Sequence, residues 1–123
     1  MNDTASALIV ELAGDYIGFL SELEPRWCKA YCRLYINESH SRAQASYEFD
    51  TRVELVSAVT WPDFYDRMLG YGAKLFAALE QKRGVMLLTV DLDYNYKVDF
   101  EWDNLNRWEI TKMDGATGRP EGI

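Results

Sequence analysis

The stretch from Val85 to Trp102 constrains the fold most, because both of its halves alternate strictly between apolar and polar residues. A period of two is typical of strands, in which successive side chains point to opposite faces. The stretch therefore predicts a β-hairpin with one apolar and one acidic face. The expected apolar face consists of Leu88, Val90 and Leu92 on the first arm and Val98, Phe100 and Trp102 on the second.

Keeping this apolar face whole determines the expected loop. A three-residue loop, Tyr94 to Tyr96, pairs Leu92 with Val98, whereas a two-residue turn would mix the faces. The same register places Asp91 opposite Asp99, although like charges directly opposite one another destabilise a strand pair. An acidic face that persists despite this repulsion is typical of a surface that meets a basic partner. The alternative interpretation is the solvated sheet face of an acidic protein.

The overall charge narrows the class of partner. The 123 residues include 20 acidic and 13 basic residues, which give a formal charge of −7. Residues 1–24 carry five acidic residues and no Lys or Arg, and residues 85–123 carry eight acidic and four basic residues. This balance disfavours direct binding to nucleic-acid phosphates and favours a basic protein partner. The oligomeric state stays open between monomer and dimer.

The sequence also predicts where the protein acts. Hydrophobic residues make up 48% of the chain, but no apolar run approaches the ~20 residues of a membrane span. The N-terminal residues lack the basic start of a signal peptide. Cys28 and Cys32, if they lie on a strand, are roughly 13 Å apart and too distant for a disulfide. We therefore expect a cytoplasmic protein with no membrane association.

The remaining periodicities predict an α+β fold. Apolar residues at helical spacing predict a helix from Asp3 to about Leu23, with Thr4 as its N-cap. A second helix is expected to start at Thr60, as its N-cap, and to end at Gly84. Strands are expected over residues 26–36, 43–49 and 53–59. With the hairpin, the order is α-β-β-β-α-β-β, which predicts an antiparallel sheet of about five strands with both helices packed on it.

The end of the chain is less regular. Residues 103–113 are compatible with a short helix or a final strand, and Trp108 and Ile110 indicate that this segment packs. Residues 114–123 are rich in glycine and poor in apolar groups, so we expect a flexible tail. The expected division is a single domain over residues 1–113, followed by that tail.

Two acidic surfaces are candidates for partner binding. The first is the hairpin, where two tyrosines would anchor a partner between carboxylates. The second is a stripe on the first helix that has no counter-charge nearby in the sequence. The hairpin candidates are Asp91, Asp93, Asp99, Glu101, Asp103, Tyr94 and Tyr96, and the helix candidates are Glu11, Asp15 and Glu22.

The sequence gives little support for a catalytic or metal-binding site. Asp91, Asp93 and Asn95 have the spacing of a calcium loop, but Tyr96 and Trp102 stand where that loop needs glycine and glutamate. The single histidine, His40, lies in a polar loop without a nucleophile nearby in the sequence. Asp91 and Asp99 could form a carboxylate pair, yet no nucleophile or cofactor motif accompanies them. We expect no enzyme activity, no cofactor and no metal.

Two stretches of the chain resemble motifs of a known family. Residues 26–31, RWCKAY, are similar to the W-x-K-x-Y motif that follows an acidic first helix in the YezG-like immunity proteins. Residues 92–102, LDYNYKVDFEW, resemble the family's acidic hairpin, although the family usually has tyrosine at Trp102 and glycine in the turn. The resemblance covers about residues 8–112. It implies a cytosolic antitoxin that binds and blocks the C-terminal domain of a polymorphic toxin, often a nuclease, as in contact-dependent growth inhibition.

A small acidic secretion chaperone is the alternative function. Such chaperones share this length, this charge and the same order of helices and strands. They hold an extended segment of their client, whereas an immunity protein binds a folded domain. The folded state of the bound partner therefore discriminates between the two hypotheses.

Overall fold

The computed structural model describes residues 2–123 and confirms the α+β fold. Its helices are α1 (Asp3–Leu23), α2 (Pro62–Ala78) and a 3-10 turn, η1 (Met113–Gly115). The observed order is α1-β1-β2-β3-α2-β4-β5, as expected. The strands are β1 (Trp27–Ile36), β2 (Ser41–Phe49), β3 (Arg52–Leu55), β4 (Gly84–Asp91) and β5 (Tyr96–Glu101).

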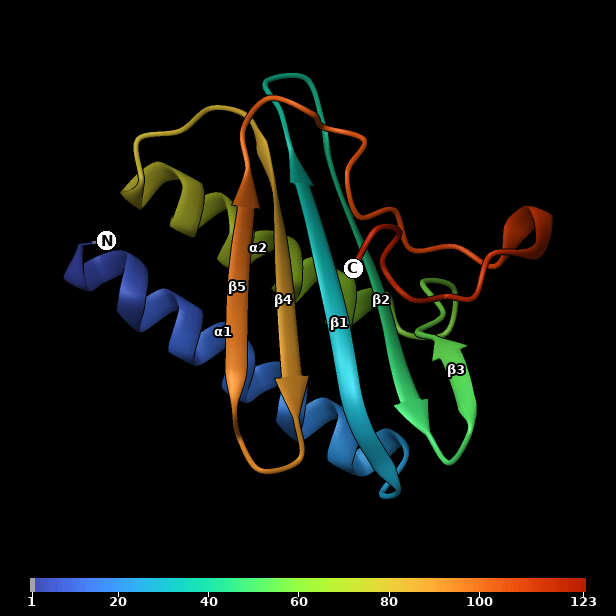
Figure 1. Ribbon diagram of the computed structural model, residues 1–123. Coiled ribbons are helices and arrows are strands. Elements are labelled where there is room, and N and C mark those ends of the chain that lie inside the picture. The colour runs from blue at the N-terminus through green and yellow to red at the C-terminus, as the bar shows by residue number, and fades with distance from the viewer. Residues whose placement is uncertain (1) are drawn as a thin grey trace.

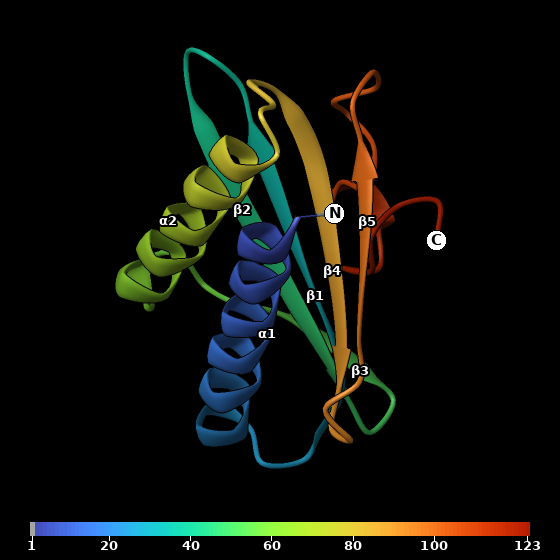
Figure 2. The ribbon, with the colours of Figure 1, turned by 90° about the vertical axis from the view of Figure 1, so that its left-hand side faces the viewer.

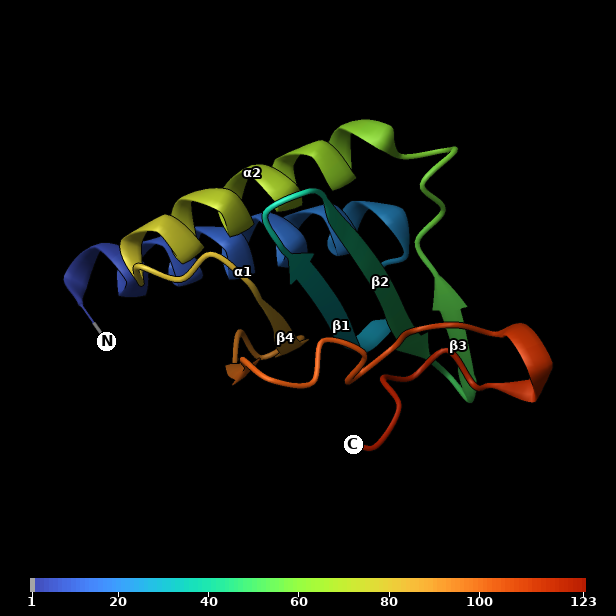
Figure 3. The ribbon, with the colours of Figure 1, turned by 90° about the horizontal axis from the view of Figure 1, so that it is seen from above.

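The five strands form one antiparallel sheet in the order β3-β2-β1-β4-β5. Both helices lie side by side on one face of this sheet (Figures 1 and 2). The chain after β5 crosses the opposite face, so the sheet lies between two covering layers (Figure 3). Within residues 2–123, no helix combines the length and the apolar character needed to cross a membrane.

The helix α1 has the predicted bounds but a different cap. The side chain of Asn2, rather than that of Thr4, accepts a hydrogen bond from the N–H of Ala5 at 2.8 Å. On the sheet side of the helix, Tyr16 is fully buried and donates its hydroxyl to the carbonyl of Tyr31 at 2.8 Å. Burial raises the pKa of Tyr16 well above its ordinary value, so the ring remains a neutral donor. This bond fixes α1 over the centre of the sheet.

A bulge at the start of β1 changes which residues face the helices. The pairing of β1 with β2 shifts between Trp27 and Lys29, which leaves Cys28 as an extra residue. Trp27 is therefore buried among the helices, whereas Cys28, expected on the apolar face, is exposed. Beyond the bulge the expected alternation holds, and Cys32 and Leu34 are fully buried in the core.

The ends of α2 differ from the expectation, and β3 (Arg52–Leu55) is shorter than the strand expected over residues 53–59. The residue before the first turn of α2 is Trp61, which makes no side-chain cap, and Pro62 opens the helix. The helix ends at Ala78, because Glu80 turns the chain with a φ of 56° and Gln81 donates its N–H to the carbonyl of Phe76. Gly84 begins β4 instead of ending the helix.

A fully buried arginine organises the face of the sheet opposite the helices. Arg33 donates from Nε to the carbonyl of Arg107 and from an η-nitrogen to the carbonyl of Leu105, both at 2.8 Å. Trp108 and Ile110 pack beside it on the sheet, as their apolar character predicted. Residues 103–112 form neither the short helix nor the strand that we considered, because their carbonyls bond to Arg33 instead of to a neighbouring strand.

The last ten residues also contact this face. Gly118 donates its N–H to the carbonyl of Thr111 at 2.9 Å, and Glu121 donates its N–H to the carbonyl of Glu109 at 3.0 Å. Arg119 forms an ion pair with Glu48 of β2 at 3.0 Å. Residues 114–123 therefore make defined polar contacts with the rest of the chain.

Candidate protein-binding surfaces

The hairpin turns earlier in the chain than expected. Val98 pairs with Leu88 instead of with Leu92, a displacement of four residues that leaves the two faces unchanged. The reason is the Asp91 side chain, which accepts the N–H groups of Asp93 and Asn95 at 2.9 and 3.1 Å and so forms the turn. Tyr94 adopts the left-handed conformation, with a φ of 64°, where we expected Asn95 to do so.

This register removes the predicted repulsion between Asp91 and Asp99. Asp99 pairs with Leu87, and Asp91 pairs with Lys29 of β1. The prediction that the two carboxylates face one another is therefore wrong. The reason is that a shift by an even number of residues preserves both faces while it changes every cross-strand partner.

Three of the hairpin carboxylates are already engaged within the chain. Asp99 lies 3.4 Å from Lys97, and Glu101 lies 2.8 Å from Arg107. Glu101 also accepts the N–H groups of Asp103 and Asn104, and these bonds, with that of Arg107 the strongest, hold its pKa below the ordinary range. At Asp91, desolvation raises the pKa, but the hydrogen bonds from Asn95 and Asp93 lower it by more, so the pKa of Asp91 also lies below its ordinary value.

The hairpin also separates its candidate residues. Asp91 and Asp93 lie at the turn, whereas Glu101 and Asp103 lie at the far end of β5. Tyr94 is the most exposed of the aromatic residues named, at 74%, and Tyr96 is 48% exposed. The structure therefore brings Asp93 and Tyr94 together at one tip but does not gather all seven hairpin candidates into one patch.

The stripe on α1 faces the second helix. Asp15 accepts hydrogen bonds from Arg67 at 3.0 to 3.3 Å and from the hydroxyl of Tyr71 at 3.1 Å. The hydrogen bond to Asp15 raises the pKa of Arg67. The expectation that the stripe lacks a counter-charge is thus wrong at Asp15, because α2 supplies one. Glu11 and Glu22 are exposed, and within residues 2–123 neither forms an ion pair.

A cleft of about 590 Å³ separates α1 from the beginning of α2. Its walls include Glu22 and Asp63, which face it from different helices, and the ring of Trp61. Phe19 packs edge-on against Trp61, with ring centroids 5.5 Å apart. Gly18 leaves open space on the α1 side. Neither Asp63 nor Glu22 takes part in an ion pair among the described residues, so the cleft presents two free carboxylates beside an exposed aromatic ring.

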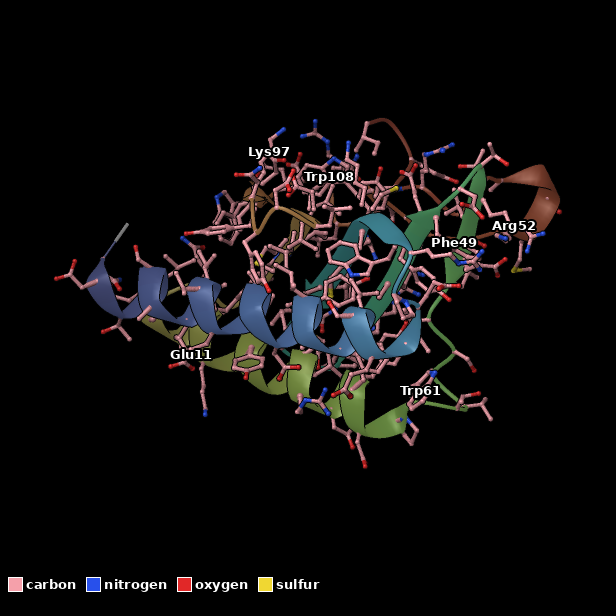
Figure 4. All side chains as sticks on the ribbon, turned by 90° about the horizontal axis from the view of Figure 1, so that it is seen from below. Glu11, Phe49, Arg52, Trp61, Lys97 and Trp108 are labelled. Atoms are coloured by element: carbon pink, nitrogen blue, oxygen red, sulfur yellow. The ribbon has the colours of Figure 1, made fainter. Side chains whose placement is uncertain are left out.

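The two helices carry most of the net negative charge. Together α1 and α2 contain six acidic and two basic residues, which gives a net charge of −4 for these two elements. Figure 4 shows Glu11 and Trp61 on this side of the molecule and Lys97 and Trp108 on the opposite side. The helix layer is therefore an acidic surface with free carboxylates in one cleft, whereas three of the five hairpin carboxylates, Asp91, Asp99 and Glu101, lie beside basic groups.

The sequence did not single out Asp63 and Trp61 as contact residues. Both residues follow Thr60 at the expected start of the second helix, where an acidic residue is common for reasons of helix capping alone. Only the packing of α2 against α1 shows that they share a cleft with Glu22. Among residues 2–123, no three His, Cys, Asp or Glu side chains cluster in a way that could hold a metal ion.

No protein-family model matches this sequence, and no curated protein matches it at a significant level.

Proposed function

We propose that this chain is an immunity protein that binds the C-terminal domain of a cognate bacterial toxin in the cytosol and neutralises it. The target fits best as a basic nuclease domain, because a nuclease needs a cationic surface to hold its nucleic-acid substrate. The observation that carries the proposal is the acidic helix layer, in which a cleft between α1 and α2 presents free carboxylates beside Trp61. The family resemblance of residues 26–31 and of the hairpin supports it.

The cleft suggests how a basic partner would be held. Within it, Arg67 binds the carboxylate of Asp15 and lies over the ring of Phe64, 6.0 Å from its centroid. Glu22, Asp63 and Trp61 offer the same combination of carboxylate and aromatic ring to an arginine or lysine of a partner. The contacts of the chain's own Arg67 support an arginine or lysine as the kind of cation that this cleft would bind.

Occupation of the cleft would block the toxin without catalysis. A cationic residue bound here could no longer contact a phosphate, and the net charge of the helix layer would repel nucleic acid from the complex. The same charge would accelerate the encounter with a basic domain at low ionic strength. Asp93 and Tyr94, at the tip of the hairpin, provide a second contact region in this proposal.

A growth experiment tests the function. The protein encoded by the adjacent upstream gene supplies the candidate toxin, and its C-terminal domain is expressed with or without this chain. We expect arrest of growth that this chain relieves, together with co-purification of the two proteins. A domain that arrests growth regardless of this chain would contradict the proposal.

The same experiment distinguishes the immunity function from the alternative function as a secretion chaperone. A secretion chaperone would bind an extended segment of its client and would relieve no toxicity. Hydrogen exchange of the bound partner distinguishes the two cases, because a folded domain keeps its protected amides and an extended segment has few. Binding to an unprotected segment alone would replace the immunity function by the chaperone function.

A further inference from the structure

The strand β5 is an open edge of the sheet. It pairs with β4 on one side only, and no element within residues 2–123 continues the sheet beyond it (Figure 1). The opposite edge, β3, has only four residues, whereas β5 has six. An exposed edge presents unpaired N–H and C=O groups that can pair with another strand.

The register shows which backbone groups of β5 are free. Asp91 donates its N–H to the carbonyl of Asn95 at 3.0 Å, so this pair is hydrogen-bonded. Antiparallel pairs alternate between hydrogen-bonded and non-hydrogen-bonded positions. It follows that Tyr96, Val98 and Phe100 occupy non-hydrogen-bonded positions against β4, and their N–H and C=O groups point out of the sheet edge.

We propose that β5 pairs with β5 of a second copy of this chain, antiparallel, with Val98 opposite Val98 on the two-fold axis. In this register the outward groups of Tyr96 bond to those of Phe100 in the second copy. Lys97 then lies opposite Asp99 of the second copy, and Asp99 lies opposite its Lys97. The two chains would form one continuous ten-stranded sheet.

Charge complementarity selects this register from its neighbours. Lys97 and Asp99 point to the same face of β5 and form an ion pair of 3.4 Å within one chain. In the dimer, each can pair instead with the opposite charge of the second copy. Opposite charges directly across a strand pair are stabilising. A register centred on Phe100 would place Asp99 opposite Glu101, and one centred on Tyr96 would leave Lys97 opposite Asn95. Only the pairing centred on Val98 matches both charges.

The apolar side of β5 fits the same arrangement. Tyr96 is 48% exposed in the single chain, and Val98 and Phe100 are half-buried against the core. In the proposed dimer, Tyr96 lies opposite Phe100 of the second copy, a pair of aromatic residues that is favourable across strands. The exposed ring of Tyr96 would then be partly covered.

Sedimentation equilibrium of the full chain over a concentration series tests the proposal. We expect a concentration-dependent mass that approaches twice the 14.2 kDa of one chain. The variant Val98→Pro should raise the dimer dissociation constant by about tenfold or more, because it removes the N–H groups that point outward at the two-fold axis. The N–H groups of β5 that bond to β4 are unaffected by this substitution. A wild-type chain that stays monomeric throughout the series overturns the proposal.

A charge exchange tests the register even if the proline variant fails to fold. Lys97→Asp and Asp99→Lys should each weaken the dimer, since each places like charges opposite one another. The double variant K97D/D99K restores both opposite-charge pairs and should return the dissociation constant to within a few-fold of wild type. A double variant as weak as the two single variants contradicts the register centred on Val98.

Discussion

Asp15 and Arg67 join the two helices of this protein through a carboxylate–guanidinium contact of 3.0 Å. Asp15 is mostly shielded from solvent, with 16% of its side chain exposed, and it also accepts a hydrogen bond from the hydroxyl of Tyr71. Glu22 lies on the same stripe of α1 but forms no ion pair among the described residues. The stripe therefore contains one carboxylate that supports the fold and others that are free for a partner.

This difference predicts that neutral substitutions at the two positions change the free energy of unfolding by unequal amounts. Asp15→Asn should lower the free energy of unfolding by about 1 kcal/mol, because it weakens the contacts to Arg67 and Tyr71. Glu22→Gln, the matched control on the same helix, should change it by less than about 0.5 kcal/mol. Urea denaturation measures both values. Equal effects of the two substitutions would contradict the assignment.

The buried Arg33 predicts a strong effect on the C-terminal segment. Arg33→Met should lower the free energy of unfolding by about 3 kcal/mol, because the carbonyls of Leu105 and Arg107 lose their charged donor. Hydrogen exchange should show faster exchange of the N–H groups of Gly118 and Glu121. Lys74→Ala, at an exposed cation of α2 on the other face of the sheet, serves as control and should leave exchange at these positions nearly unchanged.

Gly84 predicts a steric effect at the start of β4. A Cβ at this position would lie 2.6 Å from the ring of Trp102, which stacks on Phe100. Gly84→Ala should therefore destabilise the protein by about 1–3 kcal/mol. Gly70→Ala is the matched control, because a Cβ there meets nothing within 4 Å, and it should stabilise α2 by about 0.5–1 kcal/mol. Thermal unfolding followed by circular dichroism distinguishes the two signs.

The two cysteines should differ in reactivity. Cys28 is exposed at the bulge, whereas Cys32 is fully buried, and burial raises the pKa of its thiol to about 12. Because the thiolate is the reactive species, we expect iodoacetamide to modify one thiol in the native protein and two after denaturation. Mass spectrometry of the peptides identifies the modified residue. Rapid native labelling of Cys32 would contradict this description of the core.

Acid should loosen the contact between the C-terminal segment and β2. The hydrogen bond from Arg119 holds the pKa of Glu48 below its ordinary value. A carboxyl whose pKa is lowered by folding stabilises the folded state above its unfolded pKa of about 4.3, and this stabilisation is lost as the pH falls through the folded pKa. We therefore expect exchange at Gly118 to accelerate below about pH 4.3, after correction for the intrinsic rate. Glu48→Gln should remove most of this acid-dependent change.

The sequence was most informative where one periodicity spans a whole element. The bounds of α1 are confirmed from Asp3 to Leu23, because a long 3.6-residue pattern ends at Glu24-Pro25. The order of strands and helices follows from similar patterns. The register of the hairpin did not follow, since a period of two is equally compatible with pairings that differ by an even number of residues. There the side chain of Asp91 decided the turn.

The candidate binding surfaces also could be predicted only in part from the sequence. The acidic stripe on α1 was visible in the sequence, but Arg67 and Asp63 join it only through the packing of α2. Likewise, the basic and aromatic side of β1 gave no sign that Arg33 would be fully buried, because its hydrogen-bond partners are more than 70 residues away in the chain. Contacts of this kind depend on tertiary geometry, not on local pattern.

The most direct test of the proposed function is the affinity of this chain for the proposed toxin domain, measured by calorimetry with two matched charge reversals. Glu22→Lys with Asp63→Lys alters the cleft between the helices, and Asp93→Lys with Asp103→Lys changes the net charge equally at the two ends of the hairpin. We predict that the cleft variant raises the dissociation constant by at least about tenfold more than the hairpin variant does. Equal losses, or a larger loss for the hairpin variant, would contradict the assignment of the helix layer as the binding surface.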